Sequence, residues 1–297
     1  MMETREAENI LSRDYNTISP SAKSLLLLKA LTNIPFAKEA AELISLPGEY
    51  KPDFNKKDFV FWKRVVHFEN RYWSVDQLLA DLAITNILEI SSGYSLRGLD
   101  TVDQKLVHYI DTDLPDLISQ KKDFIAALKT DTGTKGELRV LPLNALDEDQ
   151  FNEIVNSFPP GPIVIVNEGL LMYLNNEEKE KLCGIIYKIL KQRGGFWITA
   201  DIYVKTTLER FDDNEDDSLK ELIEQQRIED NMFESFEVAS EFFKGEGFCI
   251  DKEALLDLPK ISSLQYLVSN ASPTDLMELK DHKKVQVTWR LKVADEN

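Results

Sequence analysis

Small and acidic residues meet in two segments of the sequence, a combination typical of a site for a nucleotide-like ligand. The segment NILEISSGYSLR reads as a short apolar strand that runs into the turn Ser91–Gly93. A second apolar segment, VHYIDTDLP, carries Asp111 and Asp113 at its end. In a strand–helix–strand unit that binds a mononucleotide, the first turn approaches the ligand through its backbone, and an acid on the second strand binds the ribose. The pattern therefore predicts a nucleoside site at these two strand ends.

Polar residues also follow the later apolar segments. Asn144 follows ELRVLPL, Asn167 to Gly169 follow IVIV, and Asp201 lies in FWITADI. Ligands of open parallel sheets bind outside the carboxyl ends of the strands, so these residues share one rim. Each of them alone is equally well explained as a helix cap or a loop residue. Their convergence from five strand ends favours a binding site.

The turn after the first strand lacks a pyrophosphate-binding pattern. In place of G-x-G-x-x-G, the sequence has Ser91 and Leu96 at two of the glycine positions, and no P-loop pattern occurs. The glycines of that pattern let a pyrophosphate lie against a helix N-terminus. A dinucleotide-dependent oxidoreductase is therefore the less favoured alternative. The expected ligand is a nucleoside without a pyrophosphate, and S-adenosylmethionine is the commonest cofactor of that kind.

From Ile84 onward, apolar strands alternate with amphipathic helices. This rhythm predicts an α/β fold, an open and mostly parallel Rossmann-like sheet with helices on both faces. A long, well-alternated segment at 285–293 suits an antiparallel strand pair at the sheet edge. We expect one domain over 1–297, with a helical cap over 1–82 and a core over 83–297. A charged insert near 206–236 interrupts the core, and the cap and the insert are expected to cover the site.

Composition narrows the functional classes. The 297 residues carry a net charge of −17, which argues against nucleic acid as a partner because phosphate binding needs a cationic surface. No apolar run has the length of a signal peptide or of a membrane span, so a cytoplasmic protein without a membrane partner is expected. Cys183 and Cys249 stand among apolar neighbours and are expected to be buried free thiols. The acidic run Asp212–Asp217 is interpreted as a solvated loop, and no metal site is predicted.

Four segments resemble, in order and spacing, the leucine carboxyl methyltransferase-like family of S-adenosylmethionine-dependent O-methyltransferases. They are ILEISSGYSLR, YIDTDLPDLISQKK, LPLNALD and VNEGLLMYLNNEEKEKL, and SPSAKSLLLLKALTNIPFAKEAAEL is similar to the helical N-terminal region of that family. The resemblance extends over residues 19–200 and implies a class I methyltransferase fold with S-adenosyl-L-methionine as cofactor. The chain departs from the family pattern at Ser91, where the family has glycine, and at Ser95 and Leu96, where it has Asp-Thr before Arg97.

The resemblance also implies roles for individual residues. An amino-acid end that carries both charges needs one cation and one anion, and Arg71 and Glu168 supply this pair. The resemblance assigns Arg71 to the methionine carboxylate, Ser91 and Gly93 to the turn against it, Asp113 with Asp111 to the ribose hydroxyls, Asn144 and Ala145 to the adenine edge, and Glu168 to the amino group of the cofactor.

The methyl acceptor is the least determined part of the prediction. A carboxylate, on a small molecule or a peptide, is ionised at neutral pH and needs no general base, whereas a hydroxyl needs one. None of the three histidines stands in a strand-end motif, which favours a carboxylate, although His67 lies near Arg71. Arg97, Met172, Tyr173 and Tyr203 are candidates for the acceptor pocket. The altered turn leaves a further alternative open, a catalytically silent relative that acts as an interaction protein.

Overall fold

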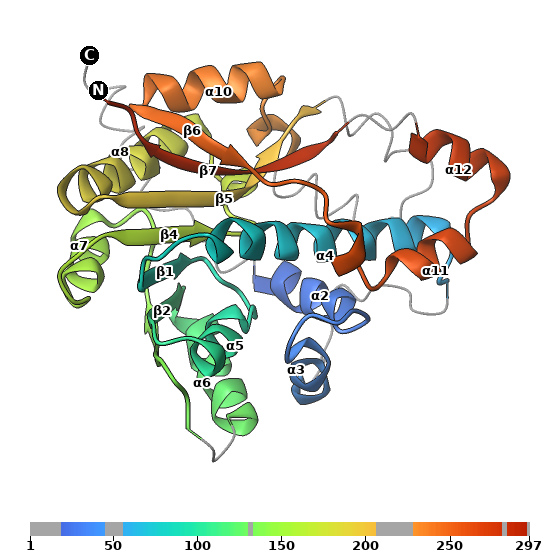
Figure 1. Cartoon of the computed structure of the whole chain (residues 1–297), viewed down its shortest axis with the longest axis horizontal. Coiled ribbons are helices and arrows are strands. Elements are labelled where there is room, and N and C mark those ends of the chain that lie inside the picture. Colours follow the sequence, from blue (N-terminus) through green and yellow to red (C-terminus); the bar gives the residue numbers. More distant parts are fainter. Residues whose placement is uncertain (1–18, 45–55, 130–132, 206–227, 281–283, 296–297) are drawn as a thin grey trace, which may run out of the picture.

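The computed structural model describes residues 19–44, 56–129, 133–205, 228–280 and 284–295 (Figure 1). Its centre is one sheet with the strand order β3-β2-β1-β4-β5-β7-β6. The strands β1 to β5 are mutually parallel, and β7 runs antiparallel to both β5 and β6. This is the Rossmann-like sheet of class I methyltransferases, as predicted. The strands are β1 (Asn86–Ile90), β2 (His108–Asp113), β3 (Glu137–Pro142), β4 (Ile163–Asn167), β5 (Gly195–Tyr203), β6 (Phe248–Glu253) and β7 (Gln286–Val293).

The strands predicted from apolar runs agree with those observed. Every residue of β1 and of β4 is buried, as expected for central parallel strands covered on both faces. The antiparallel pair at the sheet edge is confirmed, and β6 is the edge strand while β7 lies between β5 and β6.

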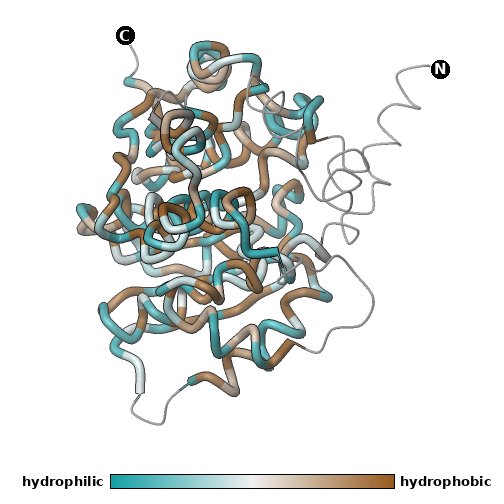
Figure 2. Tube along the Cα trace, turned by 90° about the vertical axis from the view of Figure 1, so that its right-hand side faces the viewer, coloured by the Kyte–Doolittle hydropathy of each residue, from teal (hydrophilic) through white to brown (hydrophobic). Residues whose placement is uncertain are grey.

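Helices cover both faces of the sheet. Side chains that alternate along one strand pack against the helices of opposite faces. On one face, Leu88 and Ile90 pack with residues of α7 (Glu148–Asn156), α8 (Asn176–Arg193) and α10 (Phe236–Gly245). On the other face, Ile87 packs with residues of α4 (Phe59–Ala80) and α5 (Arg97–Gln104), and α6 (Pro115–Leu128) contacts β2 and β3. The two-residue repeat of a strand produces this division. In Figure 2, hydrophobic (brown) and hydrophilic (teal) residues are mixed along the whole trace.

Several helix ends follow from local chemistry. The Asp58 carboxylate accepts a hydrogen bond from the Phe61 backbone N–H, 3.0 Å away, and begins α4. Asn175 and Glu178 form a reciprocal capping box at the start of α8. Pro115 occupies the first turn of α6, where its missing N–H costs nothing. Gly194, with φ of 72°, ends α8 and lets the chain enter β5.

The range in which the sequence predicts a helical cap is helical where the structure describes it, and α4 of this range packs on the sheet itself. The helix α2 (Ser19–Lys29) packs on α3 (Ala37–Leu43) and on α4, and α3 contacts α6. In Figure 1, α2 and α3 lie below α4 beside the end of the sheet. The cap therefore reaches the rim on which the polar strand ends meet.

The segment between β6 and β7 forms the helices α11 (Leu264–Ser269) and α12 (Pro273–Lys280), which the sequence pattern does not predict. Glu69 of α4 anchors this segment. Its buried carboxylate accepts hydrogen bonds from the backbone N–H and the hydroxyl of both Ser262 and Ser263, at 2.5–2.9 Å. A buried carboxylate needs such donors, and these hydrogen bonds therefore fix the start of α11 against α4 at Glu69.

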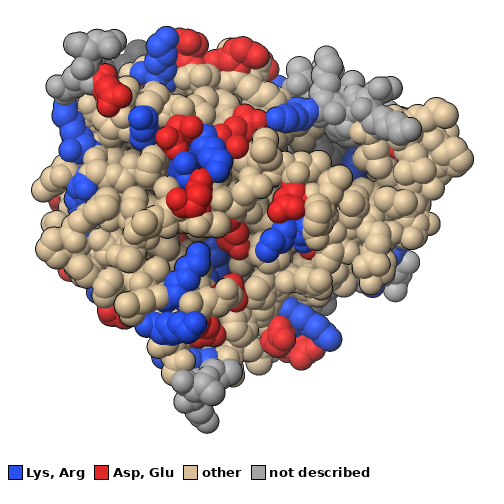
Figure 3. Space-filling model, in the orientation of Figure 1, with Lys and Arg blue, Asp and Glu red and all other residues tan. Residues whose placement is uncertain are grey.

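The remaining expectations on organisation meet the structure in part. Cys183 is buried and free, as predicted, whereas Cys249 is free but only half-buried because it lies on the edge strand β6. Most of the insert, including Asp212–Asp217, lies outside the described residues. Basic and acidic side chains are interspersed on the face shown in Figure 3. Among the described helices, none combines the length and the apolar character needed to cross a membrane.

Candidate functional site

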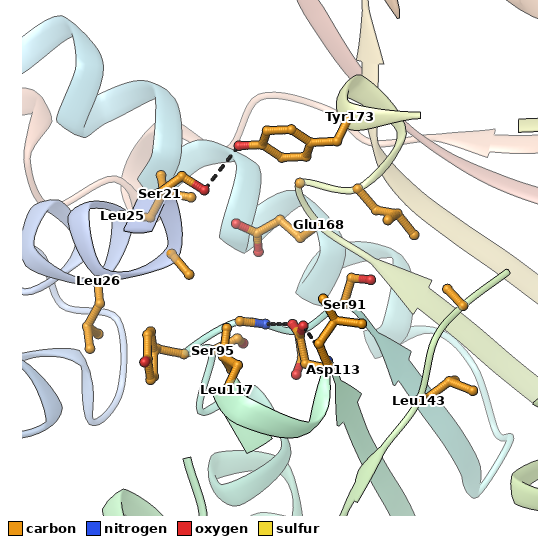
Figure 4. A pocket seen from close by; sticks show the side chains of 18 of the residues that line it. Ser21, Leu25, Leu26, Ser91, Ser95, Asp113, Leu117, Leu143, Glu168 and Tyr173 are labelled. Atoms are coloured by element: carbon orange, nitrogen blue, oxygen red, sulfur yellow. Dashed lines mark hydrogen bonds between the residues drawn. The ribbon is translucent and has the colours of Figure 1, made fainter. Parts of the chain in front are cut away.

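A pocket opens at the carboxyl ends of β1 to β4, and α2 forms its opposite wall (Figure 4). Its polar part contains Arg71 from α4 and Glu168 from the end of β4. The predicted residues that line it are Arg71, Ser91, Gly93, Asp113, Asn144, Ala145, Glu168 and Tyr173. Eight of the twelve predicted contact residues thus come together from α4 and four strand ends.

The turn after β1 presents its backbone to the pocket. Ser91 and Gly93 both have positive φ, 49° and 55°, a conformation that glycine adopts easily and serine does not. The backbone N–H of Gly93 donates to Asp113 Oδ2 and that of Leu114 to Oδ1, both at 2.7 Å. Burial raises the pKa of Asp113, and these backbone donors oppose the rise. Each carboxylate oxygen keeps a second lone pair with which it can accept a hydroxyl.

Glu168 is surrounded by cations. Its Oε1 lies 2.6 Å from Lys29 Nζ and 3.2 Å from Arg71 Nε, and its Oε2 lies 3.0 Å from an Arg97 nitrogen. Although burial alone raises the pKa of Glu168, these three charges outweigh burial and hold the pKa well below its usual range. The side chain is only 3% exposed. The end of β4 is therefore a carboxylate that stays ionised in a cation-rich surrounding.

Arg71 retains an unused donor in the wall of the pocket. Its Nε donates to Glu168 and its Nη1 donates to the Tyr203 hydroxyl, 3.0 Å away. Its Nη2 is buried and has no hydrogen-bond partner among the residues that the structure describes. A Cβ on Gly169 would lie 3.5 Å from this nitrogen, so the glycine leaves room above it. A buried cationic donor without an acceptor is costly in a folded protein and marks a position for an anion.

Asp111 does not line the pocket, so the prediction that it contacts the ligand is not supported. Asp111 and Asp113 lie on the same face of β2, but Asp111 stands one strand repeat deeper, where α6 covers it. Its fully buried carboxylate pairs with Lys121 Nζ at 2.7 Å, and Lys121 also donates to the Ser92 hydroxyl at 2.8 Å. The role of Asp111 is to position the turn through this ion pair.

Three of the four predicted acceptor-pocket residues also lie outside the lining. Arg97 is buried and bound to Glu89 and Asp76, both at 2.7 Å, because the acid in the apolar strand β1 needs a cationic partner. Met172 is not among the lining residues, and its backbone oxygen accepts a hydrogen bond from Asn231. Tyr203 supports Arg71 from behind. Of the four, Tyr173 alone reaches the pocket, where its hydroxyl and that of Ser21 are 3.2 Å apart.

His67 closes a polar chain that begins at Glu168. The Tyr203 hydroxyl accepts a hydrogen bond from Arg71, and the same hydroxyl forms a hydrogen bond with His67 Nε2, 2.8 Å away. Burial lowers the pKa of His67 to about 3, with the Arg71 charge adding to the effect, and burial raises the pKa of Tyr203 to about 12. Both side chains are therefore neutral near pH 7, and neither is among the residues that line the pocket.

The adenine-side prediction concerns the loop after β3. Asn144 is exposed at the pocket wall, and its side-chain oxygen accepts a hydrogen bond from the Leu146 backbone N–H at 3.0 Å. This Asx turn holds the loop beside the buried Ala145. The loop is thus held in a fixed shape beside the part of the pocket where the edge of a base is expected.

The sequence reasoning missed two residues that shape the site. Asp201 accepts hydrogen bonds from the backbone N–H groups of Gly169 and Leu170, at 2.5 and 2.7 Å, and so fixes the loop that carries Glu168. The sequence pattern places Asp201 at the rim of strand ends but does not indicate this function. Lys29 gave no signal, because a lysine at the end of an apolar helix reads as a surface residue.

No protein-family model and no curated protein sequence matches the chain. Its fold is similar to that of a DUF574 family protein from Streptomyces avermitilis, with 12% identity, a TM-score of 0.54, and coverage of 93% of this chain and 97% of that one. The magnesium protoporphyrin IX methyltransferase from Synechocystis, solved with bound SAH, has 10% identity, a TM-score of 0.47 and coverages of 88% and 95%.

Other similar structures are longer than this chain. The mitomycin 7-O-methyltransferase has 10% identity and a TM-score of 0.45, and the match covers 78% of this chain but 57% of that protein. The chain thus spans little more than half of that enzyme. The likeness with the higher TM-score, to the DUF574 family protein, shows a shared fold over nearly the whole length of both proteins.

Proposed function

We propose that the chain is an S-adenosylmethionine-dependent O-methyltransferase that transfers the methyl group to a carboxylate. The observation that carries the proposal is the pairing of Arg71 with Glu168 in the pocket. Arg71 has a buried Nη2 without a partner in the described part of the chain, and Glu168 is an ionised carboxylate 3.2 Å from the same guanidinium. An adjacent cation and anion fit a ligand end that carries a carboxylate and an ammonium group. Neither a plain nucleoside nor a phosphate would use both.

The nucleoside end of the proposed cofactor fits the other half of the pocket. Asp113 accepts the ribose hydroxyls with the lone pairs that Gly93 and Leu114 leave free. Asn144 and Ala145 border the adenine edge. The turn Ser91–Gly93 has no glycine-rich cradle for a pyrophosphate, and its Ser92 and Gly93 N–H groups already donate to Thr112 and Asp113, which speaks against a dinucleotide.

The residues around the pocket favour an acceptor that is already ionised. Burial raises the pKa of Tyr173, so this phenol keeps its proton near neutral pH and is a poor base. Of the histidines in the described part of the chain, neither His67 nor His108 lines the pocket. A carboxylate needs no base for attack on a methyl group, whereas a hydroxyl does.

The proposed mechanism rests on orientation and on exclusion of water. The cofactor supplies a methyl group on a positively charged sulfur, and the reaction is an in-line displacement by the acceptor oxygen. Arg71 and Glu168 fix one end of the ligand and Asp113 the other, which sets the direction of the transferred group. The apolar residues of α2 exclude water from the acceptor, and alignment of this kind lowers a barrier by several kcal/mol.

Calorimetric titration tests the proposed cofactor. We expect the wild type to bind S-adenosylmethionine and not NADH. We expect Asp113→Ala to weaken S-adenosylmethionine binding at least about tenfold, because two hydrogen bonds to a charged group are lost. The matched control is Asp123→Ala on the exposed face of α6, which should bind like the wild type. Equal affinity of Asp113→Ala and wild type would remove the ribose assignment, and no binding of either ligand would leave a silent relative.

The acceptor is identified by transfer of a labelled methyl group. The protein is incubated with isotopically labelled S-adenosylmethionine and a cell extract, and the labelled products are identified by mass. A product that releases methanol in mild base is a methyl ester and supports a carboxylate acceptor. A base-stable ether product would contradict it while leaving the cofactor assignment intact.

A further inference from the structure

Lys29 occupies an unusual position for a lysine of a covering helix. It stands in the last turn of α2, its side chain is 10% exposed, and its ammonium lies 2.6 Å from Glu168 Oε1. It lines the pocket together with Ser21, Ala22 and Leu25 on the same side of α2. The helix α2, which forms one wall of the pocket, thus contacts the Glu168 carboxylate through the charged end of Lys29.

The three cations around Glu168 are held to very different degrees. Arg97 also binds Glu89, Asp76 and the backbone oxygen of Tyr72. Arg71 also binds the Tyr203 hydroxyl. For the Lys29 ammonium, Glu168 is the hydrogen-bond acceptor that the structure shows. Burial lowers the pKa of Lys29, and the charge of Glu168 opposes this fall. Of the three cations, Lys29 is therefore the one that would lose the fewest other contacts if it moved away from Glu168.

A ligand ammonium cannot simply join this group. Glu168 already has two contacts at Oε1 and one at Oε2, and a fourth cation would stand within a few ångströms of three like charges. In a buried site such repulsion is weakly screened. An ammonium that binds Glu168 therefore has to replace one of the three.

We infer that Lys29 is a stand-in for the ammonium group of the cofactor. Glu168 offers one position for an exchangeable ammonium, which the chain fills with Lys29 until a ligand with an amino-acid end replaces it. The inference rests on the proposed function and adds a residue that determines ligand specificity. A ligand without an ammonium leaves Lys29 on Glu168, whereas one with an ammonium must break that contact, and with it a bond between α2 and the sheet.

Two ligands and four proteins test this exchange by calorimetric titration. S-adenosylhomocysteine carries the amino-acid end, and 5′-methylthioadenosine lacks it while keeping the adenosine and the thioether. The proteins are the wild type, Lys29→Met, Lys29→Gln, and Lys38→Met as the matched control on an exposed position of α3. The glutamine keeps a neutral donor beside Glu168, so it reports on the exchange if the methionine variant fails to fold.

We expect both Lys29 variants to bind S-adenosylhomocysteine about tenfold more tightly than wild type, because no charged hydrogen bond has to be broken first. Their affinity for 5′-methylthioadenosine should equal that of wild type, and Lys38→Met should be unchanged for both ligands. Unchanged or weaker binding of S-adenosylhomocysteine to the folded Lys29 variants overturns the inference and leaves the proposed function standing. Equal tightening for both ligands also overturns it, because the effect would then not involve the ammonium. A wild type that binds neither ligand removes the proposed function and the inference together.

Discussion

Individual side chains of the pocket are set by what burial demands. Glu168 stays ionised because cations surround it. Arg71 is oriented by Glu168 and Tyr203, and within the described ranges its Nη2 remains unpaired. Asp113 reaches the pocket, while Asp111, on the same strand face, forms a buried ion pair with Lys121. The identity of a residue in a motif is therefore less informative than the partners that it finds.

Ser91 offers a test at this scale. Its φ of 49° is one that a residue with a Cβ adopts at a cost of about 1 kcal/mol or more, and glycine avoids this cost. We expect Ser91→Gly to raise the free energy of unfolding by up to about 1 kcal/mol, less the larger backbone entropy that glycine loses on folding. Urea unfolding measures the change. Ser95→Gly, just after this turn and at a position without a positive φ, should be destabilising, and the opposite order of the two variants would contradict the explanation.

At the scale of the elements, α4 is the axis of the site. It supplies Arg71 to the pocket, His67 to Tyr203 of β5, and Glu69 to the start of α11. The aromatic and polar residues of this helix thus join the sheet, the cap and the segment 262–280. The sequence predicted the helix, but its several docking faces appear only when the neighbouring elements are in place.

The contact between α4 and β5 makes stability depend on pH. The pKa of the partly buried His67 is lowered to about 3, so below the unfolded pKa of about 6.5 the unfolded chain binds a proton that the folded chain excludes. The contribution of His67 to the free energy of unfolding is therefore fully present above pH 6.5 and decreases as the pH falls toward 3. Between pH 6.5 and pH 5 the loss is at most about 2 kcal/mol.

We expect His67→Gln to reduce this pH dependence, measured by urea unfolding at pH 7 and pH 5. The glutamine amide oxygen can still accept the Tyr203 hydroxyl but does not titrate. The raised pKa values of Asp76, Asp100 and Asp113 affect both proteins alike, so the difference between them isolates His67. Identical slopes for the two proteins would show that His67 titrates normally in the folded state.

For the whole molecule, the net charge of −17 is the dominant electrostatic property. Compacting this charge costs free energy through repulsion, while exposed ion pairs such as Lys188–Glu148 contribute little. Raising NaCl from about 10 mM to about 150 mM shortens the screening length from about 30 Å to about 8 Å. We expect the melting temperature to rise over this range. A sugar at equal osmolarity is the control, and a fall in the melting temperature with salt would mean that favourable ion pairs outweigh the repulsion.

The sequence by itself determined the order of strands and helices and the rim on which ligand-binding residues meet. Hydrophobic periodicity and the polar residues at strand ends are local signals, and parallel strands bring their carboxyl ends to one edge whatever the details of packing. The tertiary structure decided which polar residues face the pocket. Arg97 and Asp111 point into the interior, because Glu89 and Lys121 are buried there and need partners of opposite charge. Folding brings the members of each pair together. Lys29 lies in the site for the same reason. The buried carboxylate of Glu168 pairs with cations that are near it in the folded protein, wherever they stand in the sequence.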